Sequence, residues 1–231
     1  MIPPFPVYLF DVDGTLVDSA ADICGAIRSV LAKTSLKEPV DEVFLKRYIG
    51  HHLIDLFGDL FPEMSAGEIE NLICEYRSVY PARNHECTRL YPGVKQTIAS
   101  LGGRKSTATT KGTPTTRIVL ELFGLLPYFD HVQGTDGFPS KPAPDVIHAS
   151  LKALDVRPED CLLVGDSAPD MEAGRRAGVK ICAVRYGYGE LEKMARFEPD
   201  YWISDLRELL PMGVRENVLH GTQSLSDQVE A

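Results

Sequence analysis

A buried strand that ends in two carboxylates is the feature that most constrains how this chain can fold. Residues 7–10 form an apolar run rich in β-forming side chains, and the run stops at Asp11 and Asp13, which Gly14 follows. In open α/β sheets, ligands bind at the carboxyl ends of the strands, where the connecting loops form a crevice. Two carboxylates at such short range repel each other unless a cation or a shared proton lies between them. The motif therefore predicts a metal site at the end of the first strand.

Further strand and helix patterns follow this motif along the chain. Apolar or β-branched runs predict strands at 105–109, 131–134, 161–164, 179–184 and 201–203. Between most of them, apolar residues at three- and four-residue spacing predict helices. This alternation is typical of an α/β fold with a doubly wound parallel sheet. The run at 105–109 is the least typical strand, because it is β-branched but polar.

Residues 20–88 interrupt the alternation. They contain four segments with apolar residues at helical spacing, and no strand pattern of comparable strength appears before Leu90. We interpret them as an all-helical insertion, a mobile cap on a core made of residues 1–19 and 89–212. Residues 213–231 form a polar C-terminal tail with little periodic pattern, a composition typical of disordered segments.

The overall charge excludes some classes of partner. The formal net charge is −9 and the sequence pI is about 5.2, which argues against nucleic acid or an anionic membrane bound by general electrostatics. No apolar stretch approaches the roughly 20 residues of a membrane span, and the N-terminus lacks a basic leader. The five cysteines are scattered, which predicts thiols in a reducing compartment. We therefore expect a cytoplasmic protein.

Four predicted strand-end loops carry residues suited to metal and phosphate, and their order resembles that of a known superfamily. The run from Asp11 to Thr15, with the sequence DVDGT, resembles the opening motif of the haloacid dehalogenase superfamily. The later motifs of that superfamily resemble, in order, Thr109 with Thr110, Lys141, and Asp166 with Asp170. The helical insertion after the first motif is similar to that of the phosphoglycolate phosphatase subfamily, and the resemblance extends to about residue 210.

The resemblance implies a role for each acidic residue. Asp11 would be the nucleophile that carries the phosphoryl group as an aspartyl-phosphate, and Asp13 would be the general acid and base. Asp166, Asp11 and the main-chain carbonyl of Asp13 would bind Mg²⁺, which prefers oxygen ligands. Asp170 would hold a metal-bound water or orient Lys141.

The remaining core motifs would bind the phosphoryl group. Thr109 and the neighbouring main-chain N–H groups would donate hydrogen bonds to it, and Lys141 would neutralise its charge and that of Asp11. Related sequences often carry asparagine where this chain has Thr110, so a side-chain contact at that position would differ. Singly, Thr109 is also an ordinary β-former and Lys141 an ordinary loop lysine, and the combination of motifs favours the functional interpretation.

The candidate residues for substrate choice lie in the insertion. They flank Gly50 and are Lys46, Arg47, His51 and His52. A solvated basic helix end is an equally good interpretation of this stretch.

The resemblance thus implies a Mg²⁺-dependent phosphomonoesterase for a small phosphorylated metabolite, with phosphoglycolate the first candidate. Two alternatives stay open. A phosphomutase would use the same loops, and a catalytically silent phosphate-binding module would keep the fold. The silent module usually lacks one of the acids Asp11, Asp13 and Asp166, and this chain has all three.

Overall fold

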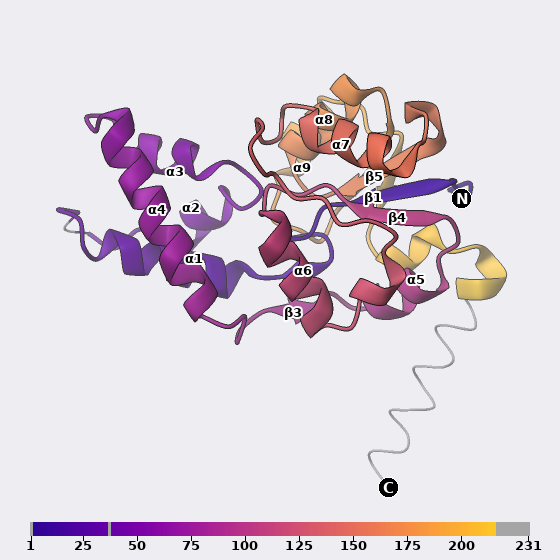
Figure 1. Cartoon of the computed structure of the whole chain (residues 1–231), viewed down its shortest axis with the longest axis horizontal. Helices are drawn as coiled ribbons and strands as arrows, with labels where there is room; N and C mark the ends of the chain where they lie inside the picture. The colour runs from indigo at the N-terminus through magenta and orange to yellow at the C-terminus, as the bar shows by residue number, and fades with distance from the viewer. Residues whose placement is uncertain (1, 37, 216–231) are drawn as a thin grey trace, which may run out of the picture.

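The computed structural model describes residues 2–36 and 38–215, and Figure 1 shows a sheet with its helices beside a separate group of helices. The sheet has five parallel strands in the order β4-β1-β5-β6-β7. The strands are β1 (Val7–Phe10), β4 (Arg104–Thr107), β5 (Cys161–Gly165), β6 (Lys180–Val184) and β7 (Tyr201–Ile203). The predicted α/β fold with a parallel sheet is confirmed.

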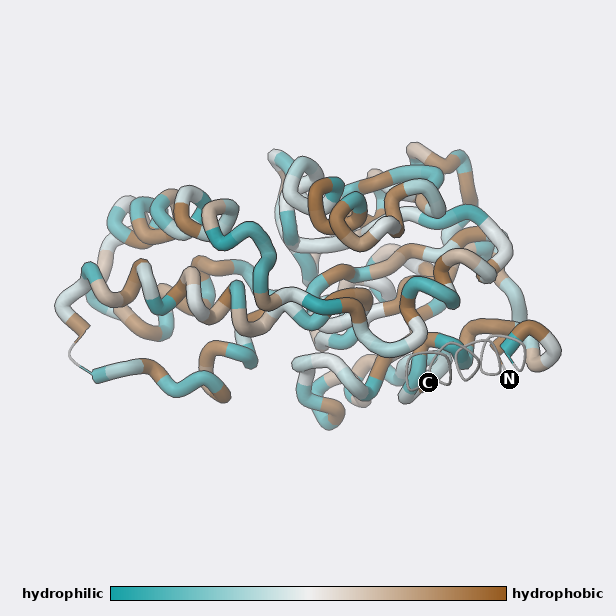
Figure 2. The backbone as a smooth tube through the Cα atoms, turned by 90° about the horizontal axis from the view of Figure 1, so that it is seen from below, coloured by the Kyte–Doolittle hydropathy of each residue, from teal (hydrophilic) through white to brown (hydrophobic). Residues whose placement is uncertain are grey.

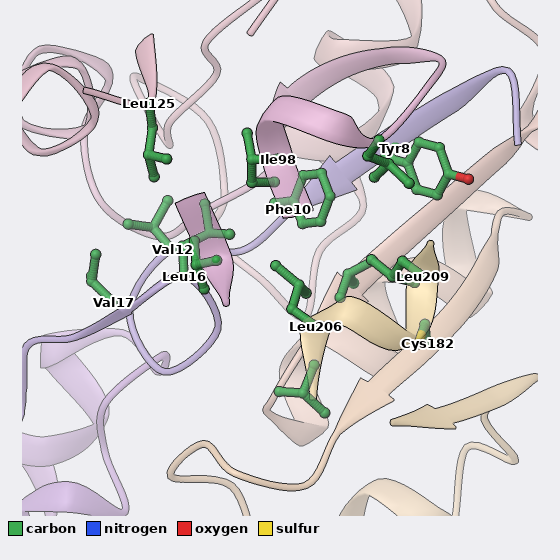
Figure 3. Close-up of a cluster of buried hydrophobic side chains, with 14 of the residues drawn as sticks. Tyr8, Phe10, Val12, Leu16, Val17, Ile98, Leu125, Cys182, Leu206 and Leu209 are labelled. Carbon is green, nitrogen blue, oxygen red and sulfur yellow. The ribbon is translucent and has the colours of Figure 1, made fainter. Parts of the chain in front are cut away.

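Successive residues of β1 anchor two separate layers of helices. Tyr8 and Phe10 pack in one buried cluster, part of which Figure 3 shows, and Leu9 packs in the cluster on the opposite face. The first cluster is covered by α5 (Val94–Ser100), α6 (Thr113–Leu122) and the 3₁₀ helix η3 (Leu206–Leu209). The second is covered by α7 (Asp145–Leu154), α8 (Ala168–Ala177) and α9 (Leu191–Ala195), of which α9 was not predicted. Short 3₁₀ turns, η1 (Leu126–Tyr128) and η2 (Pro158–Asp160), complete the core.

The helices of the insertion pack around a core of their own. They are α1 (Ala20–Leu31), α2 (Glu42–Lys46), α3 (Leu53–Leu60) and α4 (Ala66–Ala82). Ile27, Leu45, Phe57 and Ile73 meet in one buried cluster, and Figure 2 shows polar and apolar residues alternating along these helices. A two-stranded antiparallel ribbon, β2 (Val17–Asp18) and β3 (Arg89–Leu90), lies where the chain leaves and rejoins the sheet region.

Neighbouring residues explain why the side chains of β4 are polar, and they correct the prediction of a strand at 131–134. Residues 131–134 do not form a strand, although they run beside the edge strand β4. The Thr107 hydroxyl accepts a hydrogen bond from the Gln133 N–H and donates one to the Gln133 carbonyl, each at 2.8 Å, and so replaces the sheet ladder. The Ser106 hydroxyl lies 3.0 Å from the His131 Nδ1 atom and 3.3 Å from the Ser150 hydroxyl, so this buried polar side chain also has hydrogen-bond partners.

Two further predictions concern the C-terminal tail and membrane-spanning helices. Of the predicted C-terminal tail, residues 216–231 lie outside the described part of the structure. Within residues 2–36 and 38–215, none of the helices combines the length and the apolar character needed to cross a bilayer.

The packing of the core predicts a contrast between two isoleucines. Ile98 in α5 is fully buried, whereas Ile118 in α6 is 56% exposed. Replacing Ile98 by alanine should lower the free energy of unfolding by about 2–5 kcal/mol, because it leaves a cavity. The same change at Ile118 should cost less than about 0.5 kcal/mol. Urea denaturation of both variants measures the difference, and equal losses would contradict the described packing.

Candidate active site

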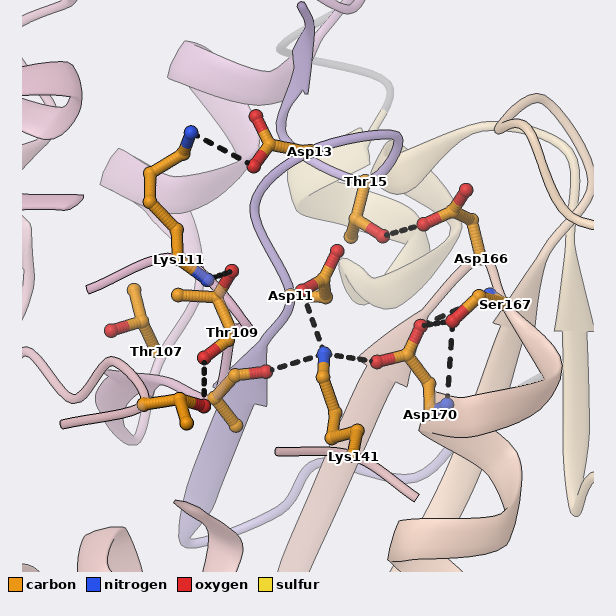
Figure 4. A network of polar contacts seen from close by, with 12 residues as sticks. Asp11, Asp13, Thr15, Thr107, Thr109, Lys111, Lys141, Asp166, Ser167 and Asp170 are labelled. Atoms are coloured by element: carbon orange, nitrogen blue, oxygen red, sulfur yellow. Dashed lines mark hydrogen bonds and ion pairs between the residues drawn. The ribbon is translucent and has the colours of Figure 1, made fainter. Parts of the chain in front are cut away.

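The loop after β1 directs two carboxylates to different partners. The Asp11 N–H donates to the Val164 carbonyl at 2.9 Å, which continues the pairing of β1 with β5. The chain then turns sharply at Gly14, whose φ of +94° is a conformation that favours glycine. A Cβ atom there would lie 2.2 Å from the Asp166 Oδ2 atom, so the close approach of the two loops also requires glycine. Figure 4 shows the result, with Asp11 facing Lys141 and Asp13 facing Lys111.

Lys141 joins three loops at their strand ends. Its Nζ donates to Asp11 Oδ1 at 2.7 Å, to the Ala108 carbonyl at 2.8 Å and to Asp170 Oδ1. The side chain is fully buried. Burial alone would lower the pKa of Lys141, but the carboxylates of Asp11 and Asp170 more than offset it and raise the pKa, so the ammonium stays charged.

The loop after β5 supplies two more carboxylates on a rigid helix start. Ser167 and Asp170 form a capping box, in which the Asp170 Oδ2 atom accepts a hydrogen bond from the Ser167 N–H at 3.0 Å. Asp166 accepts hydrogen bonds from the Thr15 hydroxyl at 3.1 Å and from the Tyr188 N–H at 2.8 Å. Asp170 is therefore held by its own loop and by Lys141, and Asp166 is held by contacts from two other loops.

Three of these acids can meet around one cation. One carboxylate oxygen from each of Asp11, Asp166 and Asp170 lies within 4.8 Å of the others, and all three residues are buried. The second oxygen of Asp11, Oδ2, is buried and has no hydrogen-bond partner among the described residues. Burial, opposed by Lys141, raises the pKa of Asp11 to about 7, and burial with two neighbouring carboxylates raises the pKa of Asp166 well above its ordinary value. These oxygen donors fit a hard divalent cation.

The predicted phosphate-binding residues lie beside this cluster, at the end of β4. Thr109 is buried, and its hydroxyl accepts a hydrogen bond from the Lys111 N–H at 3.3 Å. Its carbonyl accepts a hydrogen bond from the Thr135 hydroxyl at 2.9 Å. Thr110 is partly buried and lines a cavity. The structure thus brings the predicted core residues to one edge of the sheet.

That cavity, of about 410 Å³, lies between the strand-end loops and the helical insertion. Asp13, Thr110 and Lys111 line it from the loops, and Tyr76 and Tyr80 of α4 line it from the insertion. The candidate catalytic loops therefore form one side of the cavity, and the insertion forms the other.

The four candidates from the insertion do not lie together. His51 and His52 line this cavity, and burial lowers the pKa of His51. Arg47 lines a neighbouring cavity together with His51. Lys46 lines neither of the two and instead pairs with Glu42 at 3.0 Å.

Sequence reasoning missed a buried lysine that joins the two parts of the chain. The Lys111 Nζ atom lies 3.1 Å from Asp13 Oδ2 and donates to the Tyr80 hydroxyl at 2.9 Å. Its place two residues after Thr109, in the same strand-end loop, is a signal that could have pointed to it. Tyr80 gave no such signal, because its position fits the apolar face of a helix.

A second missed residue, Tyr188, holds the start of the insertion. Its hydroxyl accepts hydrogen bonds from the N–H groups of Ser19 and Ala20, at 2.8 and 3.1 Å, and donates to Asp18 at 2.7 Å. Because the Tyr188 N–H also binds Asp166, one residue connects the acidic cluster to the first turn of α1.

Comparison with known proteins identifies the family. The family model described as haloacid dehalogenase-like hydrolase matches residues 8–184. The chain belongs to this family. A phosphoglycolate phosphatase of Aquifex aeolicus is 31% identical over 210 residues, which cover 89% of this chain and 95% of that protein. The pyrophosphatase PpaX of Halalkalibacterium halodurans is 30% identical over 87% of this chain and 94% of its own length.

A solved structure agrees with this assignment. The chain matches a predicted phosphatase from Clostridium acetobutylicum with a TM-score of 0.83 and 26% identity, over 94% of this chain and all of the other. The predicted membership of the haloacid dehalogenase superfamily and the predicted enzyme class, a phosphatase, are thereby confirmed.

The geometry of Lys141 predicts its contribution to stability. Replacing Lys141 by methionine leaves two buried carboxylates without their cation and should cost about 3–5 kcal/mol in metal-free protein. As the matched control, Lys180→Met removes an ion pair with Asp200 in which the lysine is 51% exposed, and should cost less than about 1 kcal/mol. Denaturation in the presence of EDTA compares the two. Similar losses would show that Lys141 is not the counter-ion of the cluster.

Proposed function

We propose that this chain is a Mg²⁺-dependent phosphomonoesterase that hydrolyses a small phosphorylated metabolite through an aspartyl-phosphate on Asp11. The observation that carries the proposal is the state of the Asp11 carboxylate. One of its oxygens is fixed by Lys141, and the other is buried at the strand end where Asp13 also lies and has no hydrogen-bond partner in the part of the chain that the structure describes. A carboxylate held in this way has one oxygen oriented and one free to bind a cation or a phosphorus atom.

In the first half of the proposed reaction, a carboxylate oxygen of Asp11 attacks the phosphorus atom. The bond from phosphorus to the ester oxygen breaks, and its electron pair stays on the leaving oxygen. Asp13 gives that oxygen a proton, so the alcohol leaves neutral. Lys141 lowers the charge of Asp11 as it approaches the phosphate.

In the second half, water attacks the phosphorus atom of the aspartyl-phosphate. Asp13, now deprotonated, takes a proton from the water, and the bond from phosphorus to Asp11 breaks, which restores both residues. The Ser19 hydroxyl donates to Asp13 Oδ1 at 2.6 Å and Lys111 pairs with Oδ2, so both oxygens of the acid and base are held in place. Thr109, Thr110 and the N–H groups of their loop would bind the phosphoryl oxygens.

The acidic cluster is the proposed Mg²⁺ site. Asp11 and Asp166 would bind the ion with the main-chain carbonyl of Asp13, and Asp170 lies near enough to hold a water on it. When bound, the ion supplies positive charge that offsets the repulsion between Asp11 and a phosphate dianion.

The substrate is proposed from the relatives and from the cavity. Phosphoglycolate is the first candidate, since phosphoglycolate phosphatases are among the relatives. We propose that residues 20–88 act as a cap that closes over the cavity and excludes water. His51 and His52 are then the best placed of the four predicted specificity residues, ahead of Arg47 and Lys46.

Turnover tests the nucleophile. Asp11→Asn should lower the release of inorganic phosphate from a panel of metabolite phosphates by more than about 10³-fold, because the amide is a poor nucleophile. Asp41→Asn, at an exposed acid that caps α2 without a side-chain hydrogen bond, is the control and should keep wild-type rates. Phosphate release that survives in Asp11→Asn would contradict the mechanism. Isomerisation of sugar phosphates without net release by the wild type would favour the phosphomutase.

Binding of the ion can be measured without turnover. At a Mg²⁺ concentration 100-fold above its dissociation constant, the free energy of unfolding should rise by about 2.7 kcal/mol. Asp166→Asn should lose most of this increment, because it removes a ligand charge, whereas Asp155→Asn at an exposed position should keep it. An equal increment in both variants would place the ion elsewhere.

A further inference from the structure

Lys111 is a buried cation on the wall of the cavity. Its side chain is only 7% exposed, and it lies in the loop between β4 and α6. Its Nζ atom lies 4.4 Å above the centre of the Tyr80 ring, in addition to its contacts with Asp13 and the Tyr80 hydroxyl. Burial alone would lower the pKa of Lys111, but Asp13 and the two neighbouring tyrosines raise it, so the charge is kept.

The position of this ammonium is fixed from the insertion. The Tyr80 ring stacks on Tyr76 at a centroid distance of 5.5 Å and meets the edge of His85 at 5.4 Å. Tyr80 itself is buried, so its hydroxyl cannot easily move away from Lys111. A cation held in this way needs little reorganisation when a ligand arrives.

The ammonium also has bonding capacity to spare. A lysine ammonium has three N–H donors. Within residues 2–36 and 38–215, the Tyr80 hydroxyl accepts one and Asp13 is the other partner, so at least one donor remains. A buried donor without a partner is costly unless a ligand supplies an acceptor.

The other basic side chains that line the cavity are less suited to bind an anion. Arg77 is exposed and pairs with Glu70 at 3.2 Å. Burial lowers the pKa of His51, which favours its neutral form, and His52 uses Nδ1 to accept a hydrogen bond from the Ile54 N–H. In the described part of the cavity wall, the strongest anion attraction therefore comes from Lys111.

We propose that Lys111 is a specificity-determining residue, which binds a second anionic group on the leaving group of the substrate. This inference rests on the proposed function, because it places the ester oxygen beside Asp13. A leaving oxygen at hydrogen-bond distance from Asp13 Oδ2 lies within about 6 Å of the Lys111 ammonium, because that carboxylate oxygen is itself 3.1 Å from Nζ. The second group must then be only a few bonds from the ester oxygen. A carboxylate or a phosphate there gains a buried, charge-assisted hydrogen bond, whereas an alkyl group gains nothing.

The test compares phosphate esters whose leaving groups do and do not carry a second anionic group. Phosphoglycolate and ethyl phosphate have leaving groups of the same length, one ending in a carboxylate and the other in a methyl group, and pyrophosphate offers a phosphate instead. The readout is the ratio of kcat/KM for phosphoglycolate to that for ethyl phosphate. Lys111→Met should lower this ratio by about ten- to a hundredfold, mainly through KM for phosphoglycolate, as expected for one charge-assisted hydrogen bond. Lys111→Arg should restore most of the ratio.

The control variants separate this role from general damage. Lys152→Met changes an exposed lysine in α7 and should leave the ratio unchanged. If Lys111→Met lowers kcat/KM for phosphoglycolate and for ethyl phosphate by the same factor, Lys111 acts only through Asp13, and the proposed subsite is wrong. If Lys111→Met lowers kcat/KM for pyrophosphate together with the phosphoglycolate-to-ethyl phosphate ratio, the subsite also binds phosphate. If kcat/KM for pyrophosphate does not fall, the subsite binds carboxylates only.

A failure of the proposed function would look different. The wild type would then release phosphate from neither ester, and calorimetric binding of phosphoglycolate to wild type and Lys111→Met would decide on the subsite alone. Weaker binding to Lys111→Met, but not to Lys152→Met, would support the subsite. Equal binding to all three proteins would overturn it.

Discussion

The arrangement of this site depends on two buried ion pairs that share the Lys141 ammonium, one with the carboxylate of Asp11 and one with that of Asp170. Carboxylates at the ends of β1 and β5 lose their hydration, and each raises the free energy of its neighbours. Lys141 makes their proximity tolerable, because it contacts two of them and a carbonyl from the end of β4. The order of the strands, with β1 between β4 and β5, is what brings these three loops together.

The same cluster keeps an excess of negative charge. When the four acids Asp11, Asp13, Asp166 and Asp170 are all ionised, they exceed the two ammonium groups of Lys111 and Lys141 by two negative charges. Without a cation, burial and the neighbouring carboxylates raise the pKa values of Asp11 and Asp166 and so favour their protonated forms, whereas a divalent cation has the charge that balances the fully ionised cluster. The two ammonium groups are not equivalent. Lys141 lies wholly within the core loops, whereas Lys111 is held between a core loop and α4 of the insertion.

The sequence predicted those parts of the molecule whose signals are local. The strand before Asp11 could be identified because apolar β-formers end abruptly at acids and a glycine, and the sheet followed from repeated strand and helix patterns. The prediction of a strand at 131–134 was wrong, because nothing in the local sequence indicates that the Thr107 hydroxyl forms hydrogen bonds with both the N–H and the carbonyl of Gln133. The contacts of Lys111 depend on a tyrosine 31 residues away, and those of Tyr188 reach 168 to 170 residues back. Such pairings arise from packing, so no motif encodes them.

In the proposed mechanism, Asp11 carries the phosphoryl group during turnover. The most direct test is to mix wild-type protein with Mg²⁺ and a phosphomonoester that it hydrolyses, to stop the reaction rapidly with acid, and to analyse the peptides by mass spectrometry. We expect a phosphoryl adduct on Asp11 that forms and decays at the rate of turnover and is absent from Asp11→Asn. Phosphate release with no adduct, or with an adduct on another residue, would contradict it.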